Sequence, residues 1–149
     1  MKLSVGAKWG AVVGLVDGAI AETVLYLQRD LIAALIRQEV ARAAASSGVA
    51  ITPAQIDQIV QIAITTTYVA ALVGPLIFFT IIGLIMAAVW GRLKLPWYSI
   101  GAIFGLVLAL IGLVGIGTAR VGLEGLAGPL QNFALSLLLA YLLRSAEGT

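Results

Sequence analysis

The stretch from residue 68 to residue 90 contains 23 residues and not one charged side chain. About 20 consecutive apolar residues are enough for an α-helix to cross the hydrocarbon core of a bilayer. Three further apolar stretches lie at residues 5–27, 97–118 and 127–143. The sequence therefore predicts an all-α integral membrane protein, a single membrane domain with four transmembrane helices.

Composition favours the same class. Hydrophobic residues make up 61% of the chain, charged residues only 11%, and the mean hydropathy is +1.08. A soluble domain usually carries about a quarter charged residues. The chain has no cysteine and no histidine, which excludes disulfides, thiol chemistry, histidine metal sites and histidine-dependent triads. The chain has no run of basic residues that would predict binding to nucleic acid, and no cofactor or metal is predicted.

Residues 28–66, between the first two predicted spans, indicate an extramembrane helical hairpin whose two arms extend the first and second spans. Residues 31–45 contain good helix formers without proline or glycine, with Arg37 expected opposite the apolar side. A break follows at residues 46–48. Thr52, Pro53 and Gln55 then provide a hydroxyl cap, a proline at the first helical position and a capping-box glutamine. The alternative is a first arm that lies flat in the membrane interface as an amphipathic helix.

Small residues recur every three or four positions along the predicted helices, and such series let two helices approach closely. Whether the partner helix belongs to the same chain or to another copy stays open. Pro75 and Pro129 each follow a glycine and are predicted to kink or start a helix. The predicted packing positions are Gly6, Gly10, Gly14, Gly18, Gly101, Gly105, Ala109, Gly112, Gly128 and Ser136.

The two halves of the chain align with each other. Residues 10–29 match residues 101–120 without a gap, and the Gly-Pro-Leu that begins at Gly74 matches the one that begins at Gly128. This similarity predicts a duplicated helical hairpin. Two parallel repeats would be related by an axis along the membrane normal, with the extramembrane hairpin inserted in the first half only.

Asp17 lies near the middle of the first predicted span, where an acid costs about 2.5–3.5 kcal/mol on insertion scales. Apart from Lys8, at the start of the first span and far from Asp17, no lysine or arginine lies within the predicted spans. Asp17 is therefore expected to be protonated, hydrogen-bonded by Gln131, Asn132 or Ser136, or paired with a bound cation. Two interpretations stay open, a proton or cation site and a neutral acid that joins helices. Glu22 lies about 140° further around the helix and nearer the interface.

Charge predicts the orientation of the chain. Lys2, Lys8, Arg92, Lys94 and Arg144 flank one side of the predicted spans, whereas close to the membrane the other side carries Arg29 and Arg120. The positive-inside rule then places both termini in the cytoplasm. We expect a location in the cytoplasmic membrane of a prokaryote, with the hairpin facing outward.

No enzyme motif is found, since intramembrane aspartyl proteolysis needs membrane acids on two helices and only the first span has any. The first functional hypothesis is a non-catalytic membrane protein that acts by helix–helix association, as a homo-oligomer or as a small subunit of a larger membrane complex. The second is a small proton- or cation-coupled transporter or channel that uses Asp17. The third is a structural coat or filament subunit.

Overall fold

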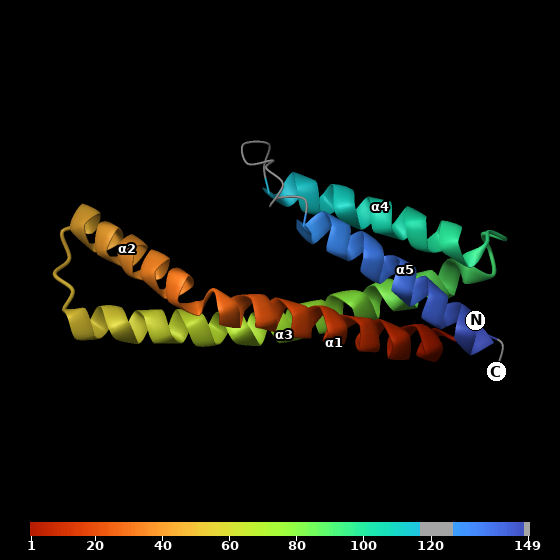
Figure 1. Ribbon diagram of the computed structural model, residues 1–149, viewed down its shortest axis with the longest axis horizontal. Helices are drawn as coiled ribbons and strands as arrows, with labels where there is room; N and C mark the ends of the chain where they lie inside the picture. The colour runs from red at the N-terminus through yellow and green to blue at the C-terminus, as the bar shows by residue number, and fades with distance from the viewer. Residues whose placement is uncertain (117–126, 148–149) are drawn as a thin grey trace. The chain divides into compact units, whose positions relative to one another are not determined.

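A computed structural model describes residues 1–116 and 127–147 (Figure 1). The predicted all-α class is confirmed, because these residues form helices and turns with no strand among them. By length and composition, two of the helices are apolar enough to cross a membrane, which suggests membrane association. The helices are α1 (Leu3–Leu27), α2 (Arg29–Ser47), α3 (Pro53–Trp90), α4 (Trp97–Ile116) and α5 (Ala127–Glu147).

The second arm of the hairpin was expected to run into the second span without a clear break, and α3 does run without interruption from Pro53 to Trp90. Other predicted boundaries differ from the observed helices. Helix α5 continues to Glu147 rather than ending near residue 143. The predicted end of the third span at residue 118 and the residues up to Arg120 in the repeat lie outside the described residues.

The chain divides into two compact units. The bundle unit contains Met1–Leu15 and Leu76–Thr149, and the hairpin unit contains Val16–Pro75. Helices α1 and α3 are each divided between the two units, with one part in the bundle unit and the other in the hairpin unit.

In the hairpin unit, local signals set where each helix begins and ends. Gln28 interrupts the helical path at φ −104° and ψ 9°, so α2 begins one residue after α1 ends. Gly48 ends α2 in the left-handed conformation, with φ 69°, and its N–H donates to the carbonyl of Ala44. Glycine adopts this conformation at little cost because it has no Cβ.

The predicted start signal of α3 is confirmed as a reciprocal capping box. The backbone N–H of Thr52 donates to Oε1 of Gln55 at 2.9 Å, and the N–H of Gln55 donates to the Thr52 hydroxyl at 3.4 Å. After this turn, α3 runs back along α2, and the two helices form an antiparallel hairpin (Figure 1).

The bundle unit contains a hydrophobic core to which all four of its helices contribute. Helices α4 and α5 pack along each other. The side chains of Phe79, Met86, Leu139 and Leu143 have no exposed surface. Large, fully enclosed side chains of this kind indicate close packing, which fixes the helices at defined registers.

Glycines bring the helices of the bundle unit together. A Cβ placed on Gly6 would lie 2.6 Å from that of Ala87, and a Cβ on Gly10 would lie 2.9 Å from the Cα of Thr80. On α3, Gly83 faces Gly6 and Gly10 in return. We call Gly6, Gly10 and Gly83 the first glycine seam. The helix that packs against the glycines of α1 is thus α3 of the same chain.

A second seam joins α4 to α5. A Cβ on Gly101 would lie 3.1 Å from the Cα of Leu137, and a Cβ on Gly105 would lie 3.1 Å from the Cα of Phe133. Both distances are tighter than ordinary van der Waals contact, so neither position has room for a side chain without movement of α5.

The two seams share a register. In the alignment of the two halves, Gly10 corresponds to Gly101 and Gly83 corresponds to Leu137. These are the residues that meet in the structure, since a Cβ on Gly83 would lie 3.0 Å from the Cα of Gly10. Within the bundle unit, α1 and α4 also run in the same direction (Figure 1).

Candidate functional site

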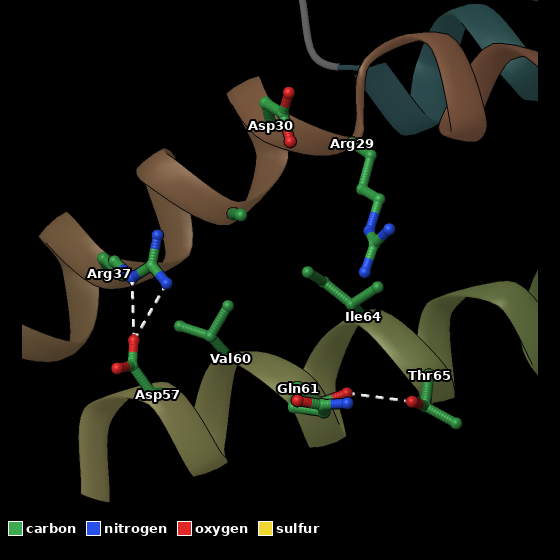
Figure 2. A pocket seen from close by; sticks show the side chains of 9 residues that line it. Arg29, Asp30, Arg37, Asp57, Val60, Gln61, Ile64 and Thr65 are labelled. Carbon is green, nitrogen blue, oxygen red and sulfur yellow. Dashed lines mark hydrogen bonds and ion pairs between the residues drawn. The ribbon is translucent and has the colours of Figure 1, made fainter. Parts of the chain in front are cut away.

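The hairpin unit contains a polar groove between α2 and α3, with a volume of about 560 Å³ (Figure 2). Side chains from both helices line it, and four of them are charged. Such a groove between two exposed helices is accessible to a partner and is only partly filled by the hairpin itself. The lining residues of this hairpin groove are Arg29, Asp30, Ala33, Arg37, Asp57, Val60, Gln61, Ile64 and Thr65.

An ion pair closes one end of the hairpin groove. Nε and one terminal nitrogen of Arg37 donate to the same oxygen of Asp57, at 3.1 and 2.8 Å (Figure 2). The two side chains are 55% and 62% exposed, so water and salt screen their attraction. The pair therefore orients α2 against α3 but contributes little to stability.

Arg37 was expected opposite the apolar side of its helix, and the structure shows it bridging to α3 instead. The reason is its position, because Arg29, Ala33 and Arg37 recur every four residues and all line the groove, so they share the side of α2 that faces α3. The ion pair had a sequence signal that we did not use. Arg37 and Asp57 stand ten residues before and ten residues after Ser47, at the hairpin tip.

Arg29 enters the groove from the start of α2. Its side chain extends across the groove toward Ile64 on α3 (Figure 2). Among the described residues it makes no ion pair. The groove therefore combines a neutralised pair at one end with an arginine at the other.

The opposite face of α2 is apolar and exposed. No residue of α2 is buried. Leu31 and Leu35 are 59% and 53% exposed, whereas Ile32, Ile36 and Val40 are half-buried. Pairing with α3 thus covers only part of the apolar side of α2 and leaves Leu31 and Leu35 outward.

The two acids predicted on the first span both lie on α1 in the hairpin unit. Asp17 and Glu22 are half-buried, and their spacing of five residues places them on different faces of the helix. The two carboxyl groups therefore do not form one site. A role for Asp17 in binding a proton or cation stays a prediction.

The polar residues predicted to bind Asp17 lie on α5 in the bundle unit. Gln131 and Asn132 are half-buried, and Ser136 is fully buried. The Ser136 hydroxyl donates its one proton to the carbonyl of Asn132 at 2.8 Å, one turn back on the same helix. The Ser136 hydroxyl therefore has no second proton to donate. The amides of Gln131 and Asn132 stay the predicted hydrogen-bond donors to Asp17.

The remaining predicted packing positions differ in how tightly they are enclosed. Gly14 is buried, and a Cβ on Gly18 would lie 3.2 Å from the side chain of Leu72. Ala109 is half-buried, and a Cβ on Gly112 would lie 3.7 Å from Pro129. Gly128 has open space around its Cα.

The two prolines occupy different helical positions. Pro129 is buried in the first turn of α5, where a missing N–H costs nothing. Pro75 lies inside α3 and deprives the carbonyl of Ala71 of its helical donor. That carbonyl faces Gly18, since a Cβ on Gly18 would lie 3.3 Å from it.

The chain matches no protein-family model, no curated protein and no solved structure. Its function has to be inferred from the residues themselves. Within residues 1–116 and 127–147, no three acidic side chains gather into a group that could hold a metal ion.

Proposed function

We propose that the chain is a polytopic membrane protein without catalytic activity, which acts by association through its helical hairpin. Four helices would span the bilayer, at about residues 5–27, 68–90, 97–118 and 127–143, as two duplicated pairs, and residues 28–66 would extend beyond it. The shared register of the two glycine seams supports the duplication. The apolar character of α1, α3 and the Trp97–Leu113 part of α4 supports the membrane placement.

The observation that carries the proposal is the exposed face of α2. The bundle unit uses the glycines of both seams for contacts within the chain. In contrast, α2 buries no residue and presents Leu31 and Leu35 outward, on the face opposite the polar groove. Large apolar side chains rimmed by polar residues are typical of a protein–protein interface. The partner is a second copy of this chain or another membrane subunit.

The experiment is a mass measurement by light scattering on the full chain purified in mild detergent. We expect the parent to be a homo-oligomer or to co-purify with a partner. Leu35→Glu should abolish the association, because a carboxylate would be buried in the interface without a counter-charge. Since Leu35 is exposed, the fold should survive the change. Ala41→Glu adds the same charge at another exposed position of α2 and should leave association unchanged.

Two results would refute this proposal. One is a monomeric parent with no partner, and the other is a Leu35→Glu variant that associates like the parent. The competing hypothesis of proton or cation transport through Asp17 has its own test. Flux in liposomes that is present in the parent and lost in Asp17→Asn, with assembly intact, would favour transport over association.

A further inference from the structure

A second hollow lies in the bundle unit, at the end where α3 stops, α4 begins and α5 stops. Its volume is about 400 Å³. That size lies within the range of about 300–1,000 Å³ that is usual for small-molecule sites. The lining residues of this aromatic pocket are Trp90, Leu95, Pro96, Trp97, Tyr98, Arg144 and Glu147.

The aromatic pocket contains one charge of each sign. The guanidinium of Arg144 lies over the ring of Trp97, 5.9 Å from its centroid. The indole Nε1 of Trp90 donates to Oε2 of Glu147 at 2.8 Å. That hydrogen bond uses one carboxylate oxygen and fixes the orientation of the acid. The pocket thus holds a positioned anion and a positioned cation, together with three aromatic rings.

The surroundings of the pocket have the composition of a membrane–water interface. The beginnings of α1 and α4 and the ends of α3 and α5 lie at the same end of the bundle unit (Figure 1). These segments hold all three tryptophans of the chain, and Trp9 carries the ammonium of Lys8 at 5.5 Å from its ring centroid. Tryptophan, tyrosine and basic residues are enriched where a helix meets the lipid headgroups. These helix ends, with Lys2 before α1 and the turn between α3 and α4, contribute five basic side chains, Lys2, Lys8, Arg92, Lys94 and Arg144.

We infer that the aromatic pocket binds the zwitterionic headgroup of a phospholipid, with phosphate against Arg144 and ammonium against Glu147. Arginine presents a planar fork of donors that suits a phosphate. A carboxylate beside aromatic rings suits an ammonium group, which is attracted both by the charge and by the ring faces. The exposed ring of Tyr98 is available for that contact. This inference rests on the proposed membrane placement, but not on association through the hairpin.

The test uses tryptophan fluorescence of the full chain in mild detergent, titrated with short-chain phosphatidylethanolamine, short-chain phosphatidylglycerol or inorganic phosphate. We expect saturable binding of phosphatidylethanolamine, about tenfold tighter than of phosphatidylglycerol. Inorganic phosphate should bind far more weakly, since it offers no ammonium. Equal affinity for the two lipids in the parent would overturn the inference, and so would tighter binding of phosphatidylglycerol.

Two variants test which charge of the pocket binds which group of the lipid headgroup. Glu147→Gln keeps an acceptor for the Trp90 indole and removes the negative charge, so the preference for phosphatidylethanolamine should disappear. Arg144→Gln should lower the affinity for both lipids about tenfold. Arg92→Gln removes one positive charge outside the pocket lining and should alter neither result. A preference that survives Glu147→Gln would contradict the assignment. Because Leu35→Glu should bind lipid like the parent, failure of the lipid site is distinguishable from failure of hairpin association.

Discussion

Different interactions stabilise the bundle unit and the hairpin unit. In the bundle unit, glycine seams bring backbones into contact, and Phe79 and Leu139 have no exposed surface. In the hairpin unit, Val60 is the one large apolar side chain of the described residues that is buried, and the cross-helix ion pair is more than half exposed. Close packing tolerates no added volume, whereas an exposed ion pair is worth about 0–1 kcal/mol. The hairpin should therefore open long before the bundle unfolds.

The largest expected effect is in the first glycine seam. Gly10→Leu would drive a side chain into the backbone of Phe79 and Thr80, and overpacking of this kind costs about 3 kcal/mol. We expect a clearly lower melting temperature in detergent. The matched control is Gly91→Leu, directly after the end of α3, where a Cβ would have open space and φ is not positive, so the melting temperature should change little. Equal melting temperatures of Gly10→Leu and the parent would show that the first glycine seam does not stabilise the bundle unit.

A smaller effect is expected at the hairpin tip. Gly48→Ala would force an L-residue to φ 69°, at a cost of roughly 1–2 kcal/mol. The fraying should be local, so cleavage by a broad-specificity protease near residues 46–52 should rise about 5–30-fold while the global melting temperature stays constant. Gly91→Ala is the control, because Gly91 has open space and no left-handed conformation. A cleavage rate unchanged by Gly48→Ala would show that the tip is not held by this cap.

The smallest effect is expected for the ion pair. A double-mutant cycle with Arg37→Gln and Asp57→Asn should give a coupling of about 0.2–1 kcal/mol, measured by hydrogen exchange of α2 amides. Added salt should reduce the coupling, because both side chains are exposed. The pair Glu39 and Arg42, within α2, is the control and should not change the opening of the hairpin. A coupling of several kcal/mol that is insensitive to salt would mean that the groove is far less solvated than its exposure indicates.

Local signals in the sequence were sufficient to locate the end of α2 and the start of α3. Pro53 and Gln55 predicted where α3 starts, and Gly48 accounts for the end of α2. These devices act within one helical turn, so neighbouring residues are enough to recognise them. The one-residue break at Gln28 carried no such signal, since neither proline nor glycine stands there.

Contacts between helices were harder to predict. Gly83 packs against Gly6 and Gly10, but the other glycine of α3, Gly74, stands nine residues away, so no four-residue glycine series marked Gly83. The aromatic pocket joins Trp90 to Glu147 across 57 residues of chain. Sequence periodicity tells which face of a helix is apolar, but not which residue of a distant helix lies opposite.

The central claim is that the predicted spans lie in the bilayer and that the hairpin of residues 28–66 lies outside it. Because the chain has no cysteine, single cysteines can be introduced without background labelling. Ile81 and Ile103 are 49% and 48% exposed on the bundle unit, and Ala34 and Gln58 are exposed on the hairpin. In sealed proteoliposomes, a membrane-impermeant maleimide should label A34C and Q58C and should not label I81C or I103C. Comparable labelling of all four positions would contradict the claim and indicate a helical bundle whose apolar faces lie in water.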